Sequence, residues 1–222
     1  MIFLKFIVIS VICMALYGCV SVPDKKNAKN DLDVFIFSSD DINEDVLGEA
    51  SPVRVSILQL ANAVEFNQMS ELSANAGYKT HLGESVLDEV NFTIRPSSQM
   101  EFKLPLKDQT EYLGIVVAYR DLSKNWKLAL YKQDKKWYQS GGDFLYLQVT
   151  SDGVIPLTKN EALTKIAAKK LEQQGQVLQD LTDKEKDKIL KQLDKAMEDK
   201  KAADLKRGIF IEQSNKNIQV GE

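Results

Sequence analysis

Cysteine and histidine are almost absent from this chain of 222 residues, which holds two cysteines, Cys13 and Cys19, and a single histidine, His81. A zinc ion needs several close Cys, His or carboxylate ligands, so the sequence gives no basis for a zinc site. His81 stands in the polar stretch Tyr78-Lys79-Thr80-His81 and is expected at the surface, which leaves no credible histidine for a Ser–His–Asp triad. No glycine-rich loop that could hold a phosphate is present either. These gaps argue against an enzyme, and we expect no cofactor.

Long apolar runs are also missing, except for one near the N-terminus. Phe6–Ala15 is an apolar segment of about ten residues behind the positive Lys5, which fits a signal-peptide core and falls short of the roughly 20 residues of a membrane-spanning helix. Leu16-Tyr17-Gly18-Cys19 follows the bacterial lipobox, in which a small residue precedes the cut and the cysteine thiol takes a lipid. We expect residues 1–18 to be a lipoprotein signal peptide and Cys19 to carry the lipid. The alternatives are an uncleaved anchor and a chance cysteine beside an ordinary secretory signal.

Residues 19–31 are mostly polar and are interpreted as a lipidated flexible tether that reaches at most about 40 Å. Val20 directly after the cysteine is not Asp, the residue that retains enterobacterial lipoproteins at the inner membrane, so the outer membrane is favoured. With Cys13 in the leader and Cys19 lipidated, no disulfide is expected, and stability must come from an apolar core. The formal net charge of -3 gives no reason to expect nucleic acid as a partner.

Short apolar segments with alternating or continuous patterns predict a mainly β fold between residues 32 and 157. Val34–Phe37 is apolar on both sides, which suits a strand that is covered on both faces. Tyr112–Tyr119 is nearly all apolar and is the best candidate for a central strand. The other predicted strands are Val53–Ile57, Val90–Ile94, Met100–Leu104, Trp126–Tyr131, Phe144–Thr150 and Val154–Leu157. Together they predict an antiparallel β-sandwich of seven or eight strands.

Two helical regions are predicted around this sandwich. A short helical insertion that packs on the sandwich is expected where apolar residues recur at a spacing of three, at Phe66, Met69 and Leu72. Beyond Pro156, residues 158–161 and 182–185 both match the capping box, Thr-x-x-Glu, and each opens a predicted helix. Lys, Glu and Asp crowd the other faces of these helices. We interpret residues 158–222 as a charged helical extension, a solvated hairpin with a thin apolar seam; the alternative is a helix that docks on a partner.

An acidic loop separates the first two predicted strands. From Asp41 it matches the first five positions of an EF-hand loop, Asp-x-Asn-x-Asp, but Val46 replaces the required Gly and Pro52 the required Glu. An EF-hand is therefore excluded, and a weaker, irregular calcium site stays open as an alternative. At about a dozen residues the loop is longer than a hairpin needs, which is typical of functional loops. A plain solvated loop is the other interpretation.

Several motifs occur together in a familiar order. Asn43–Val53 contains Asn, then Gly, then Ser-Pro-Val, and the strand that follows ends in Gln59-Leu60; Leu113–Asp121 is followed by Trp126. In these motifs, spread over residues 32–157, the sequence resembles the TssJ (SciN) family, the outer-membrane lipoproteins of the type VI secretion system. Glu49 departs from the family, in which a basic residue is common at this place, and the extension lies outside the family's usual domain.

The resemblance implies a transthyretin-like antiparallel β-sandwich without catalysis, lipid-anchored to the periplasmic face of the outer membrane. It also implies that the protein tethers the secretion system's membrane complex by binding the periplasmic C-terminal domain of TssM through the loop between the first two strands. The partner-binding residues expected from it are Asp40, Asp41, Ile42, Asn43, Glu44, Asp45, Val46, Leu47, Gly48 and Glu49.

Within this loop, we expect the acidic groups to steer association with a basic face, and Ile42, Val46 and Leu47 to make the desolvated contact. The rival hypothesis is an envelope-stress or chaperone-like lipoprotein that acts through its C-terminal helices.

Overall fold

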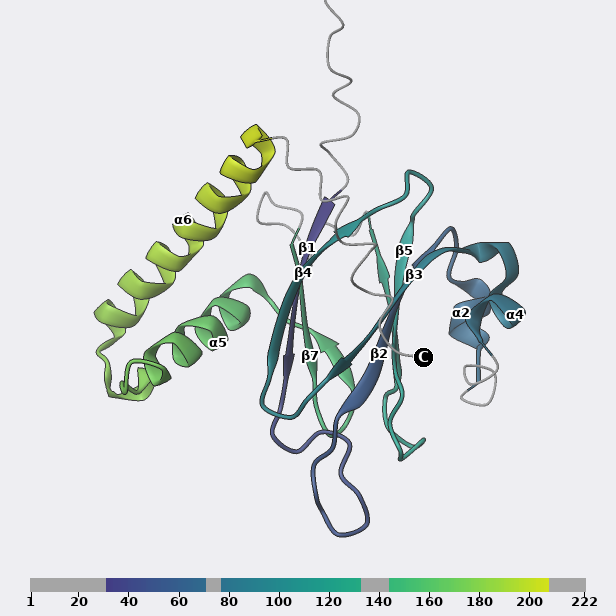
Figure 1. The fold of residues 1–222 in the computed structure, drawn as a ribbon, viewed down its shortest axis with the longest axis horizontal. Coiled ribbons are helices and arrows are strands. Elements are labelled where there is room, and N and C mark those ends of the chain that lie inside the picture. The colour runs from purple at the N-terminus through teal and green to yellow at the C-terminus, as the bar shows by residue number, and fades with distance from the viewer. Residues whose placement is uncertain (1–30, 71–76, 133–143, 208–222) are drawn as a thin grey trace, which may run out of the picture.

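The computed structural model describes residues 31–70, 77–132 and 144–207, which form two facing four-stranded sheets with helices on the outside (Figure 1). The first sheet has the order β4 (Gln99–Pro105), β1 (Asp31–Ser38), β7 (Phe144–Val149) and β8 (Val154–Pro156). The second has the order β3 (Val86–Ile94), β2 (Val53–Leu60), β5 (Tyr112–Val117) and β6 (Lys127–Tyr131). The mainly β sandwich predicted from the sequence is confirmed, including β5 as an interior strand. One expectation needs correcting, because β1 and β7 pair in parallel rather than antiparallel.

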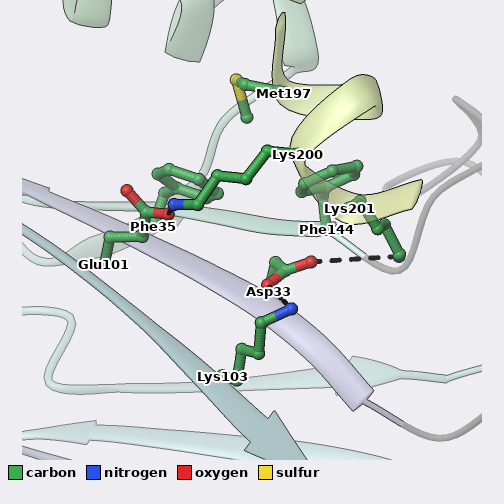
Figure 2. Close-up of a pocket in the computed structure, with 8 residues that line it drawn as sticks. All are labelled: Asp33, Phe35, Glu101, Lys103, Phe144, Met197, Lys200 and Lys201. Atoms are coloured by element: carbon green, nitrogen blue, oxygen red, sulfur yellow. Dashed lines mark hydrogen bonds and ion pairs between the residues drawn. The ribbon is translucent and has the colours of Figure 1, made fainter. Parts of the chain in front are cut away.

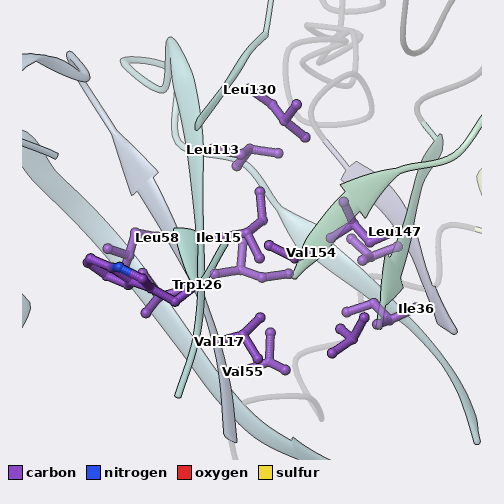
Figure 3. Close-up of a cluster of buried hydrophobic side chains, with 14 of the residues drawn as sticks. Ile36, Val55, Leu58, Leu113, Ile115, Val117, Trp126, Leu130, Leu147 and Val154 are labelled. Carbon is purple, nitrogen blue, oxygen red and sulfur yellow. The ribbon is translucent and has the colours of Figure 1, made fainter. Parts of the chain in front are cut away.

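The core lies between the two sheets, where the inward-facing residue of each pleat meets the opposite sheet. Ile36 and Leu147 of the first sheet face Val55, Ile115 and Val117 of the second, and all five are buried (Figure 3). Because successive strand residues point to opposite faces, every second residue of these strands is directed outward and needs a separate cover. The helices supply that cover on both sides of the sandwich.

One buried polar side chain, Gln59 of β2, links the second sheet to the first. Its Nε2 donates to the carbonyl oxygen of Pro105 at 2.8 Å, while its Oε1 accepts from the Thr110 hydroxyl and the Lys107 N–H, both at 2.8 Å. With both its nitrogen and its oxygen in hydrogen bonds, the amide can be buried without a large desolvation penalty. Gln59 therefore fixes the end of β4 and the turn after it against β2.

The helical insertion covers the outer face of the second sheet. Helix α2 (Val64–Gln68) places the Phe66 ring over Gly114 of β5, where an added Cβ would lie 2.7 Å from the ring. The Lys127 ammonium group then donates to three carbonyl oxygens at the end of α2, including that of Met69 at 2.6 Å. The predicted packing role of Phe66 and Met69 is confirmed, although the helix ends before Met69; Leu72 lies outside the described residues. Helix α4 (Tyr78–Leu82) and the turn η2 (Gly83–Ser85) complete this side.

The C-terminal extension covers the outer face of the first sheet, which carries four buried aromatic side chains, namely Phe35, Phe37, Phe144 and Tyr146. Helix α5 (Lys159–Glu172) has one buried face, made of Ala162, Leu163, Ile166, Ala167 and Leu171, of which Ala162 and Ile166 pack with these aromatic side chains. The prediction of a solvated hairpin is therefore wrong for α5, because an aromatic sheet face of this size gains more by burying an apolar helix face than by meeting water.

Helix α6 (Asp183–Arg207) follows the short turn η3 (Leu178–Asp180) and lies mostly exposed beside α5. Among the α6 side chains that the structure describes, Leu193 and Met197 pack, partly buried, against the aromatic cluster. Both predicted capping boxes are confirmed: the Thr158 and Thr182 side chains exchange hydrogen bonds with Glu161 and Glu185. For α6, the structure agrees with the thin apolar seam that the sequence predicted.

Candidate partner-binding loop

The loop between β1 and β2 runs from Ser39 to Pro52 at one end of the sandwich. Figure 1 shows it projecting beyond both sheets, at the opposite end of β1 from Asp31, where that strand begins. Its residues fall into a tip and a base with different surroundings, and these surroundings decide which side chains can meet a partner.

The tip is a closed turn built around the Asp45 carboxylate. Asp45 Oδ1 accepts from the N–H groups of Leu47 at 2.8 Å and Glu49 at 3.0 Å, while the Asp45 N–H donates to the Glu49 carbonyl oxygen. The donors of Glu49 and Leu47 hold the pKa of Asp45 below its ordinary value. Gly48, at φ +79°, takes the left-handed conformation that closes the turn. This turn displays Val46, which is fully exposed, and Leu47, which is 80% exposed.

The base of the loop is buried in the sandwich. Ile42 has no exposed surface and belongs to the main core, so its expected role in the desolvated contact is wrong: no partner can reach it in this conformation. Asn43 is also buried and joins two segments, since its Oδ1 accepts from the Arg120 N–H at 2.8 Å and its Nδ2 donates to the Pro52 carbonyl oxygen at 3.1 Å. Its φ of +51° is one that asparagine tolerates better than most residues. We call Asn43 the clamp residue, because its side chain holds the base of the loop in place and is too buried to contact a partner.

The remaining acidic residues differ from one another. Asp41 accepts hydrogen bonds from the hydroxyls of Ser39 at 2.6 Å and Ser151 at 2.8 Å, and these donors lower the pKa of its carboxyl. Asp40, Glu44 and Glu49 are exposed and have no ion-pair partner within the described ranges, and Gly48 is exposed beside them. Of the ten residues expected to bind a partner, those with accessible side chains are therefore mainly Asp40, Glu44, Val46, Leu47 and Glu49.

Sequence reasoning missed the loops that support this one. Arg120 and Ser151 come from the β5–β6 and β7–β8 connections and hold Asn43 and Asp41 in place. No local spacing in the sequence relates these positions, because the contacts depend on how three separate loops meet at one end of the sandwich. His81, expected at the surface, is exposed on α4.

Other kinds of site find little support in the part of the chain that the structure describes. No three His, Cys, Asp or Glu side chains there come together in a way that could hold a metal ion. None of the described helices combines the length and the apolar character needed to cross a bilayer. A cavity between α6 and β1, lined by Asp33, Phe35, Glu101, Lys103, Phe144, Met197, Lys200 and Lys201 (Figure 2), has a volume of about 20 Å³. Such a cavity has room for about one water molecule, so it is no ligand site.

Comparison with known proteins gives the family. A family model described as type VI secretion lipoprotein, with the names VasD, EvfM and TssJ, matches residues 30–160. The chain belongs to this family. None of the curated proteins compared with the chain matches it. Because α5 begins at Lys159, the family match ends where the helical extension starts.

Solved structures of family members share the sandwich. Lip of Serratia marcescens, a membrane-bound component of the type VI secretion system, is 19% identical with a TM-score of 0.53 and covers 59% of this chain and 99% of its own. The lipoprotein TssJ1 of Pseudomonas aeruginosa is 21% identical with a TM-score of 0.50, and the match covers 58% of this chain and 95% of TssJ1. A chain from a type VI membrane complex is 18% identical with a TM-score of 0.51, and the match covers 58% of this chain and 98% of that chain. The similarity concerns the fold, and it extends over nearly the whole length of each relative.

Proposed function

We propose that the protein is an outer-membrane lipoprotein, anchored through Cys19, that tethers the type VI secretion membrane complex by binding the periplasmic C-terminal domain of TssM. The β1–β2 loop is the contact element. The observation that carries this proposal is the tip of that loop, where Val46 and Leu47 are displayed to solvent by a turn whose backbone is held by Asp45. Two adjacent apolar side chains with this exposure gain by being desolvated against a partner.

The construction of the loop favours binding over a purely solvated role. A loop that is ordered before it meets its partner loses less conformational entropy on binding, which improves affinity. Here the base is fixed by Asn43 and the tip by Asp45, so Val46 and Leu47 are held in place. The exposed carboxylates of Asp40, Glu44 and Glu49 would speed association with a basic face more than they would strengthen the complex.

The direction of β1 fits a tether. Residues 19–31 would lead from the lipid into the start of β1 at Asp31, and the strand of eight residues, about 25 Å long, then carries the chain to the loop at the opposite end. The loop would thus face away from the membrane. Cys19 and most of the proposed tether lie outside the described residues. The rival hypothesis of a protein that acts through its C-terminal helices loses support from α5, whose apolar face is buried, with Ala162 and Ile166 packed on the aromatic side chains of the first sheet.

The test is a binding titration of the detergent-solubilised full-length chain against the purified TssM periplasmic domain. The double variant Val46→Asp, Leu47→Asp is expected to weaken binding at least about 100-fold, because it removes two apolar anchors and places charges in the contact. A matched control is Val64→Asp on α2, where the side chain is 60% exposed away from the loop; it should bind like the unchanged protein. Wild-type affinity of the double variant would refute the loop assignment.

A further inference from the structure

Another exposed apolar side chain lies close to the loop assigned above, in a separate segment of the chain. Leu122 is 51% exposed in the connection between β5 and β6, which runs from Ala118 to Trp126. The same connection includes Arg120, whose N–H binds the clamp residue Asn43 of the β1–β2 loop. Leu122 therefore stands two residues from a direct link to that loop.

The two loops display their apolar residues in the same way. In the first, Asp45 Oδ1 accepts from the N–H two residues on, at Leu47; in the second, Asp121 Oδ1 accepts from the Ser123 N–H, also two residues on, at 2.9 Å. Both are Asx-turns, in which the aspartate side chain accepts a hydrogen bond from the backbone two residues on. Val46 and Leu122 directly follow the aspartates, and both are exposed.

The turn between β7 and β8 holds the β5–β6 connection in place. Asn125 forms a bridge with Gly153 of the β7–β8 turn and donates its N–H to the Asp152 carbonyl oxygen at 3.0 Å. Gly153, at φ +152°, approaches Asn125 so closely that an added Cβ would lie 2.5 Å from the Asn125 Cβ. The neighbouring Ser151 hydroxyl donates to Asp41 in the β1–β2 loop. These hydrogen bonds connect the β1–β2, β5–β6 and β7–β8 loops to one another.

We propose that Leu122 joins Val46 and Leu47 in a single binding surface, the three-loop surface, and that it takes an apolar pocket on the same partner protein. The inference rests on the proposed function, because it extends the contact assigned to the β1–β2 loop. It adds a residue from a separate segment of the chain. Since interfaces concentrate their binding energy in a few apolar anchors at the centre, a third anchor on a fixed neighbouring loop enlarges that centre.

Charge indicates what kind of partner fits this surface. The β1–β2 loop carries the exposed carboxylates of Asp40, Glu44 and Glu49. The cations of these loops are fewer: Arg120 is exposed, and Lys124 lies 3.9 Å from Asp121 and 3.5 Å from Asp152. An anionic lipid surface would be repelled by this arrangement. A protein face with an apolar pocket and Lys or Arg around it is complementary to it.

The test compares single variants of the detergent-solubilised full-length chain in titrations against the purified TssM periplasmic domain. Leu122→Asp is expected to weaken binding at least about tenfold, and Leu122→Ala by a smaller factor in the same direction. The matched control is Val177→Asp between α5 and α6, since Val177 has almost the same exposure, 53%. It should leave the affinity unchanged. Far-UV circular dichroism of each variant checks that the sandwich is folded.

The outcomes separate this inference from the proposed function. If Val46→Asp, Leu47→Asp abolishes binding but Leu122→Asp binds like Val177→Asp, the β1–β2 loop is the contact and the three-loop surface is refuted. If Leu122→Asp weakens binding while the Val46 and Leu47 variant binds normally, the partner uses the β5–β6 loop alone, which refutes both assignments as stated. Loss in both, with Val177→Asp unchanged, is the expected result. A photo-crosslinking phenylalanine at position 122 should also be captured by the partner, and its failure to crosslink would overturn the inference.

Discussion

Asn43 offers the sharpest test of how the loop is held. Replacing it by alanine, Asn43→Ala, removes the hydrogen bonds to the Arg120 N–H and the Pro52 carbonyl oxygen, at 2.8 and 3.1 Å. Each lost bond to a partly buried backbone group costs about 1 kcal/mol of unfolding free energy. Alanine at φ +51° costs roughly 1 kcal/mol more, because it lacks the short polar side chain that lets asparagine adopt the left-handed conformation. The expected loss is therefore about 3 kcal/mol.

The companion variant Asn43→Gly separates the two contributions. Glycine also loses the hydrogen bonds but accepts a positive φ, so it should lie between wild type and alanine, about 1 kcal/mol more stable than Asn43→Ala. Urea unfolding followed by far-UV circular dichroism gives both differences. The clamp argument fails if Asn43→Ala stays within 0.5 kcal/mol of wild type. Equal stability of the two variants would instead mean that the positive φ carries no strain.

Three further predictions concern the helices and the sheet faces that they cover. Gly114→Ala should lower the stability by about 1–3 kcal/mol and the melting temperature by several degrees, because the new methyl group meets the Phe66 ring; an unchanged melting temperature contradicts this. Tyr146→Phe should leave the stability unchanged or raise it by up to about 1 kcal/mol, since the buried Tyr146 hydroxyl has no hydrogen-bond partner within the described chain; a clear loss in urea unfolding would reveal one. In about 1 M salt the amides of α6 should exchange hydrogen faster while those of β2 do not, because the contact between Lys159 and Asp194, at 2.5 Å, is electrostatic; equal protection in low and high salt would contradict this.

The strands could be predicted because their pattern reflects their surroundings directly. Val53–Ile57 alternates as a strand with two different faces should, and Val34–Phe37 is apolar throughout because both of its faces are covered. The sequence also marked both helix starts of the extension, since a capping box depends only on residues three apart. It did not reveal that α5 is the cover of the Phe35 face, because periodicity says that a face is buried and not what buries it.

The loop between the first two strands was predicted from the sequence, but the sequence could not separate its buried residues from its exposed ones. Ile42 and Val46 are both aliphatic residues in an acidic stretch, yet one lies in the core and the other in solvent. The difference arises from the tertiary contact between Asn43 and Arg120, which fixes the base of the loop, and from the local turn around Asp45, which displays the tip. The motif residues that carry the family resemblance here, Asn43 and Gly48, turn out to be those that shape the loop, while the displayed Val46 and Leu47 lie between them.

The position of β1 has a mechanical consequence. In the proposed arrangement, tension between the lipid and the partner would enter the domain at Asp31 and leave it at the β1–β2 loop, so the load would run along this one strand. β1 lies between two neighbours, paired with β4 from Asp31 to Phe37 and with β7 from Asp33 to Ser38. Since the lipid and the partner would pull on the two ends of the same extended strand, the covalent backbone of β1 would carry the load, and its hydrogen bonds to β4 and β7 would not have to break. The sandwich is thus oriented to resist extension along the axis on which a tether is pulled.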